Sequence, residues 1–372
     1  MYDCIVIGAG PAGTTALFHL AQKGARVLGL EKSPLPRRKT CAGALSGLAM
    51  ANLPKDIVPL IKASIHQVEL KCLPTVTQSW SFSQPVAHMT VRKELDYILQ
   101  KRAQTSGAQI IANTRVTGIT KQPDSVRVHT KNKDYEAKMV ICATGANPLP
   151  GNPAPNCGFG LEVDLPLSQQ EQSHWQDKIY IQYGEPPYGY GWAFSKGKQL
   201  SVGVCRLHSV WLDLRFYLNR LLTSLNLSST FKQRGHKIPI SLSKKMAGER
   251  ILLIGDAAGL TDPFTGEGIS YALVSGRLAA QHGLQGLAAE DYTFYNYEEH
   301  LHQTIGKQLK LAGTIASILY RFPQLVTKCV TTFPELIRTY FQMVGSELDY
   351  EGFLTLINNH LLLGKKQDHY LT

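Results

Sequence analysis

One cysteine stands in a segment that could do chemistry, because cations precede it and small residues follow it. The cations are Arg37, Arg38 and Lys39, the cysteine is Cys41, and the small residues are Ala42, Gly43 and Ala44. The cations could meet a diphosphate, and the small residues suit a backbone that lies against a flat ligand. The cysteine could serve there as a proton donor or as a wall beside a reacting bond, or it could simply be a small buried hydrophobe.

A second candidate feature is a set of three aromatic residues at alternate positions. Tyr190, Trp192 and Phe194 would share one face if this segment forms a strand. Such a face forms either part of an ordinary core or the apolar wall of a ligand cavity. The spacing alone fits both interpretations.

The cysteine segment follows a glycine motif at the amino terminus, which must position it. Residues 4–7 form a short apolar run typical of a buried parallel strand, and Gly8, Gly10 and Gly13 follow in G-x-G-x-x-G spacing. A helix expected over residues 11–23 would offer its amino-terminal N–H groups to a pyrophosphate. The chain then returns in a second strand to Glu31, which is placed to bind an adenosine ribose. The pattern predicts a dinucleotide-binding βαβ unit.

Two later segments extend this site. Residues 139–142 form an apolar strand that runs into residues 143–145, Ala-Thr-Gly. Residues 250–254 form another buried strand, and Asp256 follows it with a carboxylate for ribityl or ribose hydroxyls. The loop over residues 263–268 opens a helix that runs to about residue 280, whose amino terminus would stabilise the negative charge of a reduced flavin. The three separated segments together predict one FAD site.

The chain resembles the geranylgeranyl reductase family of FAD-dependent oxidoreductases, within the para-hydroxybenzoate hydroxylase-like flavoproteins. Residues 37–45 are similar to the family's R-x-K-x-C-G-G-A-L stretch, with Ala42 at the first glycine. Residues 187–195 are similar to its P-x-x-Y-x-W-x-F-P signature, with Ser195 at the final proline. The resemblance implies that Cys41 lies beside the flavin ring, that the aromatic sheet roofs a polyprenyl cavity, and that Arg92 lies near the FAD diphosphate. The two departures imply a difference in substrate shape.

The full set of expected site residues follows from the motifs and the resemblance together. The expected FAD contacts are Gly8, Gly10, Pro11, Ala12, Gly13, Glu31, Lys32, Arg38, Ala42, Gly43, Ala44, Arg92, Val116, Ala143, Thr144, Gly145, Gly255, Asp256, Pro263, Gly266, Gly268 and Ile269. Cys41 is the expected catalytic residue, and Tyr190, Trp192 and Phe194 are the expected substrate contacts. No metal site is expected.

The resemblance implies reduction of isolated carbon–carbon double bonds in a polyprenyl substrate, such as geranylgeranyl diphosphate or a geranylgeranyl-bearing lipid. Reduced flavin N5 would give a hydride to one alkene carbon while a proton reaches the other. Since no second G-x-G-x-x-G motif is present, NADPH would bind transiently, or reduced ferredoxin would supply the electrons. One alternative is a flavin monooxygenase or other oxidative tailoring enzyme on the same scaffold, although no W-x-W-x-I motif of halogenases is present. Another is a flavin-bearing binding or electron-carrier protein, which would have no apolar cavity at the flavin.

The composition of the chain limits which classes of partner and which cellular location we expect. The net charge of +11 fits either a generally basic surface or contact with an anionic membrane or an acidic partner. No basic run alternates with aromatic residues, so nucleic acid is not expected. The seven cysteines are scattered without a C-x-x-C pair, which favours reduced cytosolic thiols over disulfides or a zinc site. With no signal peptide and no apolar run of about 18 residues, we expect a cytoplasmic protein that is free or peripheral to a membrane.

The expected fold class is α/β, with a Rossmann-like FAD-binding domain interleaved with an antiparallel-sheet substrate domain and followed by a helical region. The FAD-binding domain is expected over 1–72, 92–150 and 245–290, the substrate domain over 73–91 and 151–244, and the helical region over 291–372. Residues 235–239 are expected in a linker between the two domains. The helical region should break at Pro323, Pro334 and Gly345, and it either packs on the body, closes a lipid tunnel or rests on a membrane interface.

Overall fold

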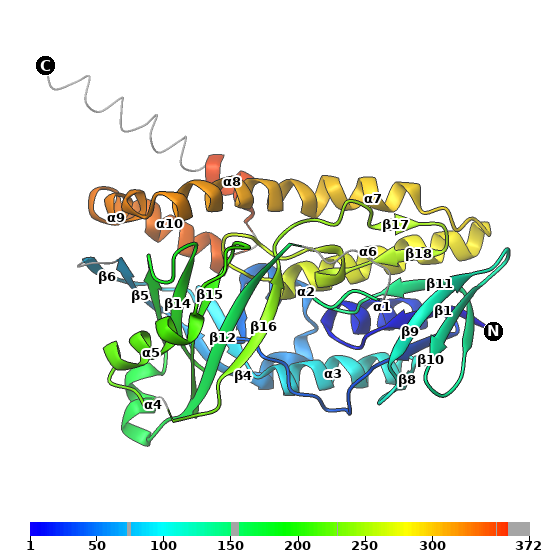
Figure 1. Ribbon diagram of the computed structural model, residues 1–372, viewed down its shortest axis with the longest axis horizontal. Coiled ribbons are helices and arrows are strands. Elements are labelled where there is room, and N and C mark those ends of the chain that lie inside the picture. Colours follow the sequence, from blue (N-terminus) through cyan, green and yellow to red (C-terminus); the bar gives the residue numbers. More distant parts are fainter. Residues whose placement is uncertain (73–75, 150–155, 229, 347, 356–372) are drawn as a thin grey trace, which may run out of the picture.

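The computed structural model describes residues 1–372 apart from 73–75, 150–155, 229, 347 and 356–372. The described part contains an eight-stranded, a seven-stranded and a three-stranded sheet. Figure 1 shows the eight-stranded sheet to the right, the seven-stranded sheet to the left, and the C-terminal helices along the top of both. The predicted α/β fold with a C-terminal helical region is confirmed. The expected boundary between residues 150 and 151 lies outside the described residues.

The eight-stranded sheet is built around the predicted amino-terminal strand, β1 (Tyr2–Ile7). Its other strands are β2 (Val27–Leu30), β8 (Gln109–Ile111), β9 (Val116–Lys121), β10 (Val126–Thr130), β11 (Tyr135–Cys142), β17 (Ala247–Gly248) and β18 (Ile251–Leu253). The order β18-β11-β1-β2-β8 is parallel throughout, and β17 adds an antiparallel edge. Strands β9 and β10 form an antiparallel meander that continues from β11. The predicted βαβ unit therefore lies at the centre of this sheet.

The two faces of β1 are covered by different layers, as the alternation of side chains along a strand requires. Cys4 and Val6 pack with the helices α1 (Pro11–Gln22) and α6 (Ile269–Ala289). Ile5 and Ile7 instead pack with the apolar residues of the β9–β10 meander. Because both faces are covered, β1 has the continuous apolar sequence of a buried parallel strand.

The helices α1 and α6 approach closely through small residues. A Cβ atom on Gly276 of α6 would lie 2.4 Å from the backbone oxygen of Ala12 on α1. A third helix, α3 (Arg92–Thr105), packs on α1 from the other side. The sequence predicts that α6 ends near residue 280, but the helix continues to Ala289.

The seven-stranded sheet has the order β16-β12-β15-β14-β13-β5-β6 and is antiparallel except where β13 meets β5. Its strands are β5 (Gln67–Cys72), β6 (Val76–Ser81), β12 (Cys157–Pro166), β13 (Lys178–Tyr183), β14 (Gly189–Ser195), β15 (Gln199–Arg206) and β16 (Arg234–Pro239). Helices α4 (Gln169–Trp175) and α5 (Leu214–Ser224) pack against one face of this sheet. The opposite face packs with the C-terminal helices.

Two sequence expectations about this sheet are wrong. The expected linker at residues 235–239 is part of β16, because its backbone pairs with β12 from Cys157↔Pro239 to Glu162↔Arg234. The expected FAD-binding segment 1–72 includes β5, yet β5 pairs in parallel with β13 inside the seven-stranded sheet. Both β16 and β5 belong to this sheet because they pair with strands far away in the sequence, β12 and β13.

A small three-stranded sheet connects the two larger sheets. It contains β3 (Ala44–Leu45), β4 (Ile61–Ile65) and β7 (Ala87–Thr90), in the order β3-β7-β4. Between β3 and β4 lie the helix α2 (Gly47–Asn52) and the 3-10 helix η1 (Lys55–Leu60). Since β3 directly follows the cysteine segment, this sheet fixes where that segment ends.

The C-terminal region is helical and breaks where the prolines predict. It contains α7 (Tyr295–Leu301), the π-helical segment η3 (His302–Gly306), α8 (Lys307–Arg321), α9 (Pro323–Thr332) and α10 (Pro334–Gly345). Pro323 and Pro334 each begin a new helix, since proline fits the first helical position but not the interior. Among the helices of the described residues, none combines the length and the apolar character needed to cross a bilayer.

The contact between α1 and α6 predicts a strong response to a small substitution. We expect Gly276→Ala to lower stability by about 1 to 3 kcal/mol, because the added methyl group meets the Ala12 carbonyl although alanine is the better helix former. The matched control is Gly118→Ala, where the nearest atom is a flexible His129 side-chain carbon at 3.8 Å. Thermal unfolding of both variants measures the effect. A Gly276→Ala midpoint equal to that of the control would contradict the close packing.

Candidate functional site

One cavity of about 950 Å³ lies between the eight-stranded sheet, the seven-stranded sheet and the C-terminal helices. This volume is at the upper end of the range of roughly 300 to 1,000 Å³ found for ligand pockets. Most expected site residues line it: Gly8, Gly10, Pro11, Ala12, Glu31, Lys32, Arg38, Cys41, Ala42, Gly43, Ala44, Arg92, Val116, Ala143, Thr144, Gly145, Tyr190, Trp192, Phe194, Asp256, Gly266, Gly268 and Ile269. Segments from one end of the chain to the other therefore meet around a single space.

Three expected residues do not line this cavity. A Cβ atom on Gly13 would lie 2.0 Å from the Gly8 oxygen, so this glycine lets α1 pack on the end of β1. Gly255 has a positive φ of 55° and begins the 3-10 helix η2 (Gly255–Ala258) behind the wall. Pro263 faces a separate outer groove beside α8.

The amino terminus of α1 opens into one end of the cavity. Gly10 is the N-cap residue and makes no side-chain cap, so the first-turn N–H groups are directed at the cavity without a competing acceptor from that residue. Glu31 closes the turn, since its two carboxylate oxygens accept hydrogen bonds from the backbone N–H groups of Ala9 at 3.0 Å and Ser33 at 3.0 Å. The uncapped α1 terminus at this end of the cavity therefore suits an anion held against the backbone.

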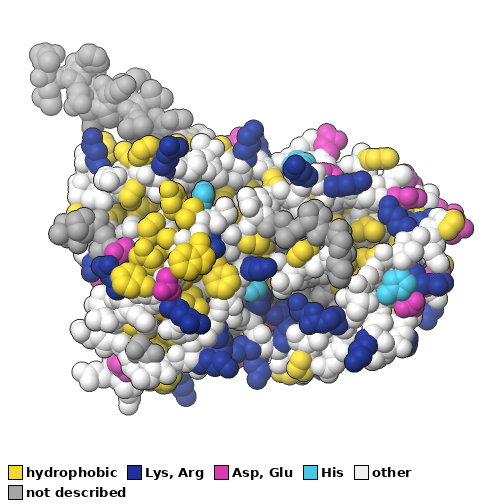
Figure 2. Space-filling model, viewed as in Figure 1, with side chains coloured by type: hydrophobic (Ala, Val, Ile, Leu, Met, Phe, Trp, Pro, Cys, Tyr) yellow, Lys and Arg dark blue, Asp and Glu magenta, His cyan; other side chains and the backbone are white. Residues whose placement is uncertain are grey.

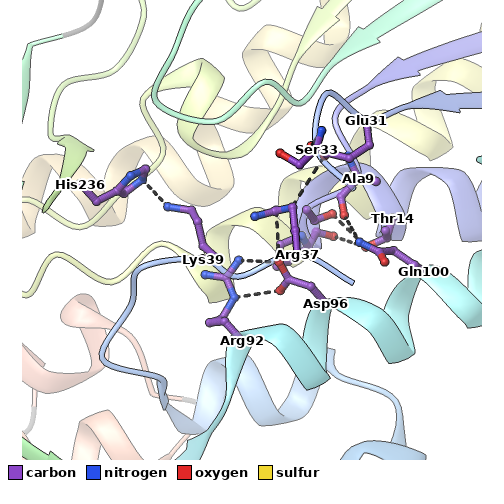
Figure 3. A network of polar contacts seen from close by, with 12 residues as sticks. Ala9, Thr14, Glu31, Ser33, Arg37, Lys39, Arg92, Asp96, Gln100 and His236 are labelled. Atoms are coloured by element: carbon purple, nitrogen blue, oxygen red, sulfur yellow. Dashed lines mark hydrogen bonds and ion pairs between the residues drawn. The ribbon is translucent and has the colours of Figure 1, made fainter. Parts of the chain in front are cut away.

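A network of charged side chains lies next to this turn (Figure 3). Arg92 at the start of α3 donates from Nε to Asp96 Oδ1 at 2.8 Å, and Arg37 Nη2 lies 3.2 Å from Asp96 Oδ2. Burial works against the charged form of Arg92, but Asp96 and the Cys41 thiol outweigh it and raise the pKa of Arg92. Arg37 Nε is buried and has no hydrogen-bond partner among the described residues. The network thus holds cations at the cavity with donor capacity left over.

A half-buried lysine and a half-buried histidine form a contact that the sequence motifs do not reveal. Lys39 points at His236 of β16, and its Nζ is in hydrogen-bond contact with the His236 Nε2 (Figure 3). Burial, together with the charges of Lys39 and Arg92, lowers the pKa of His236 to about 3. Burial also lowers the pKa of Lys39 to about 8, although Asp256 acts in the opposite direction. A neutral histidine is therefore the acceptor that this lysine meets.

Two side chains from the seven-stranded sheet hold the Cys41 peptide. The backbone N–H of Cys41 donates to Glu162 Oε1 of β12 at 3.0 Å, and its carbonyl accepts from Lys196 Nζ at 2.9 Å. Lys196 also reaches Asp164 Oδ1 at 3.1 Å. Burial raises the pKa of the Glu162 carboxyl, although Lys196 acts against this effect. The cysteine segment is thus fixed from both sides of its peptide.

The aromatic triplet lies both in the core and at the cavity surface. Tyr190, Trp192 and Phe194 all line the cavity, and the Trp192 ring lies 6.0 Å from Tyr190 and 6.4 Å from Phe194. Apolar residues of β13 and the C-terminal helices continue the same wall: Ile179, Ile181, Leu319, Val326, Ile337 and Phe341. Ser195 does not line the cavity, whereas Ala42 does, so of the two departures from the family pattern only Ala42 touches this space.

The loop before α6 forms the remaining wall. Asp262 Oδ1 accepts hydrogen bonds from the N–H groups of Phe264 at 2.7 Å and Thr265 at 3.0 Å, and its Oδ2 accepts from the Tyr350 hydroxyl at 2.7 Å. Gly268, the N-cap of α6, has no side-chain cap and lines the cavity. A second helix amino terminus therefore faces the same space as α1.

These observations fit the FAD that the motifs predict. The anion site at α1, the acidic turn at Glu31 and the cations Arg37 and Arg92 suit a dinucleotide, and the α6 terminus suits a flavin ring. Among the described residues, no group of three His, Cys, Asp or Glu side chains could hold a metal ion.

The sequence motifs did not reveal Glu162, Lys196 and His236. Glu162 is a carboxylate inside an apolar strand, and that contrast was the available signal for a functional role. His236 lies in a segment with little apolar alternation, so its strand and its contact with Lys39 depend on pairing across the sheet.

Comparisons with known proteins agree with this geometry. A model described as pyridine nucleotide-disulphide oxidoreductase matches residues 5–156. The chain is 30% identical over 294 residues to a geranylgeranyl diphosphate reductase of Rhodobacter capsulatus, covering 75% of this chain and 74% of that protein. It is 28% identical over 376 residues to a digeranylgeranylglycerophospholipid reductase of Thermoplasma acidophilum, covering 89% and 93% of the two chains.

Solved structures share the fold at lower identity. A geranylgeranyl bacteriochlorophyll reductase-like protein from Thermoplasma acidophilum superposes with a TM-score of 0.79 at 23% identity, covering 96% of this chain and 95% of that one. A flavin-dependent brominase gives a TM-score of 0.75 at 18% identity, covering 98% and 99%. At these identities the structures establish the fold alone.

The neutral, half-buried His236 predicts a pH dependence of stability. The unfolded chain protonates His236 near its ordinary pKa of 6.5, whereas the folded chain does so only near 3, so this contribution is present above pH 6.5 and is lost as the pH falls toward 3. We expect His236→Asn to remove up to about 1.4 kcal/mol per pH unit from the slope in that window. Urea unfolding at several pH values measures the slope. His174→Asn, at an exposed position on α4, is the control, and an unchanged slope in His236→Asn would contradict the assignment.

Proposed function

Because this chain belongs to the geranylgeranyl reductase family of FAD-dependent oxidoreductases, we propose that it reduces carbon–carbon double bonds of a polyprenyl substrate. The observation that carries the proposal is the continuity of one cavity. It joins the dinucleotide motif at Gly10 to the apolar wall at Trp192 without a break. A cofactor bound at the first end would face a chain bound at the second.

The apolar end of the cavity suits a long hydrocarbon substrate. Its walls are aromatic and aliphatic, and Tyr183 and Tyr320 stack there with ring centroids 5.6 Å apart. Such walls hold an isoprenoid by burial of apolar surface and exclude water from the reacting bond. This cavity also counts against the alternative of an electron carrier without a substrate.

Reduction of an alkene adds one hydride and one proton, and bound FAD in its reduced form supplies the hydride. The side chains of the protein hold the cofactor and deliver the proton. The α1 terminus, Arg37 and Arg92 would bind the diphosphate, and Glu31 would bind the ribose. Cys41 would hold the proton at Sγ, next to the small backbone of Gly43, whose N–H lies 3.4 Å from that sulfur. Glu162 and Lys196 position this thiol through its peptide.

Electrons reach the site from outside in this proposal. The described residues form one dinucleotide motif at the cavity, so NADPH would bind transiently or reduced ferredoxin would dock. Stopped-flow reduction of the purified flavoprotein by each donor separately identifies which one serves.

The reaction itself gives the first test. We expect the anaerobically reduced protein to add two hydrogens per turnover to geranylgeranyl diphosphate or to a geranylgeranyl-bearing lipid, as measured by mass spectrometry. A set of prenyl substrates that all return unchanged would overturn the proposal. Oxygen uptake in proportion to substrate consumed would instead support the oxidative alternative.

Cys41 gives the second test. We expect Cys41→Ala to lower the rate of the substrate half-reaction by about 100-fold or more, because a positioned proton donor contributes on that order. FAD content and reduction by the electron donor should stay close to wild type. Cys329→Ala on α9 is the matched control, since that cysteine lies outside the cavity lining. A Cys41→Ala rate equal to that of the control would show that Cys41 is not the proton donor.

A further inference from the structure

Two stretches of the chain, one after β15 and one in the C-terminal helices, expose many large apolar side chains. Most exposed large hydrophobic side chains of the described residues fall within 210–231 and 318–354: Val210, Trp211, Phe216, Phe231, Ile318, Phe322, Leu325, Phe333, Leu348 and Leu354. Trp211 is 83% exposed, and Phe322 and Phe333 at the two helix junctions are 50% and 51% exposed. A helix that only covers a core carries polar residues on its outer face, so this face needs a partner.

The two stretches lie on either side of one groove. His208, three residues before Trp211, and Arg321, the neighbour of Phe322, both line the outer groove beside α8. Figure 2 shows hydrophobic side chains gathered on the left half of the molecule, where the seven-stranded sheet meets the C-terminal helices, with Lys and Arg side chains around them and some Asp and Glu side chains at the edge. We call Trp211, Phe322 and their exposed apolar neighbours Val210, Ile318 and Leu325 the docking surface.

The charges at this surface are mainly positive, although one exposed carboxylate, Asp213, lies two residues after Trp211. Helices α8 to α10 carry the cations Lys307, Lys310, Arg321, Lys328 and Arg338 and a single carboxylate, Glu335. Lys310, Arg321 and Lys328 are exposed and form no ion pair with the described residues. No Asp or Glu lines the outer groove in the part of the chain that the structure describes. The partner must therefore be anionic as well as apolar, which disfavours a second copy of a chain with a net charge of +11.

The docking surface is only one helix layer away from the substrate cavity. Ile315 and Leu319 of α8 line the cavity, whereas Ile318 of the same helix is 47% exposed on the outside. The outer groove and the cavity also share two lining residues, Thr261 and Tyr320. A lipid that leaves a bilayer at this surface thus has a short route past Tyr320 to the aromatic wall.

We propose that the docking surface rests on an anionic lipid bilayer, with Trp211 and Phe322 in the interfacial region and Lys310, Arg321 and Lys328 over the head groups. Tryptophan favours this region because its ring is apolar and its N–H stays hydrated. Basic residues add attraction to anionic lipids. The inference deepens the proposed function, since a membrane-held prenyl lipid would enter the cavity directly.

The experiment is vesicle co-flotation of the full-length flavoprotein. We expect binding to vesicles that contain phosphatidylglycerol, weaker binding to phosphatidylcholine alone, and weakening with salt. The double variant W211S/F322S should lose at least tenfold in affinity. The control Tyr295→Ser removes an aromatic residue that is 80% exposed on α7, away from α9 (Figure 1), and should bind like wild type.

A second double variant, which removes two positive charges, tests the proposal independently of the aromatic variants. R321Q/K328Q should weaken binding by about fivefold for each charge removed, whereas the control K23Q/K131Q, at exposed lysines on the eight-stranded-sheet side, should not. Thermal unfolding and FAD content verify that each variant folds.

Three outcomes would overturn the docking proposal. They are no binding to either vesicle, equal binding by W211S/F322S and Tyr295→Ser, or a dimer in analytical ultracentrifugation that W211S/F322S dissociates while vesicle binding is unchanged. Turnover on a detergent-dispersed prenyl substrate separates this proposal from the proposed function. Flotation without turnover refutes the reductase activity alone, and turnover without flotation refutes the docking surface alone.

Discussion

The open cavity is the constraint on which the rest of the structure depends. Protein interiors normally pack to high density, so a space of about 950 Å³ persists only if each of its walls is supported from behind. The central strand β1 is supported by α1 and α6, which pack so tightly that glycine is required at Gly276. The aromatic wall is supported by the packed strands of the seven-stranded sheet, where Gly203 leaves room for the Trp192 ring.

The cysteine segment has no regular structure of its own and depends on both sheets. Its backbone is held by Glu162 and Lys196 from the seven-stranded sheet and continues into β3 of the small sheet. Of its three cations, Arg37 meets Asp96 on the FAD-binding side. Arg38 and Lys39 instead meet Asp164 and His236 of the seven-stranded sheet. Any shift of one sheet relative to the other would therefore move the Cys41 thiol. A buried carboxylate and lysine are costly, but here they fix a loop against two separate layers.

The predictable part of the fold is the part that local backbone rules decide. Gly8, Gly10 and Glu31 follow from the geometry of one tight turn, and Pro323 starts a helix because of its own ring. Glu162 and Lys196 instead meet Cys41 across 121 and 155 residues of sequence. The same reason explains β5 and β16, because a strand that depends on a distant partner has no local signal that identifies its sheet. His236 lay in such a strand, and so its contact with Lys39 was missed.

The C-terminal helices show a related limit of sequence patterns. A helix with apolar residues on two faces indicates burial on both sides, yet the pattern does not say which side meets protein, ligand or solvent. The structure distinguishes the inner side from the outer side, since Leu319 lines the cavity whereas Phe322 is half exposed. Because the cavity leaves part of their inner face without protein contacts, the C-terminal helices depend on the contacts that remain to hold them on the body of the protein. Tyr320 supplies one of these contacts through its stack on Tyr183 and its hydroxyl bond to the Phe264 carbonyl. Because both contacts lie at the boundary between groove and cavity, the residue that holds the cover in place is also the one that a substrate entering from outside must pass.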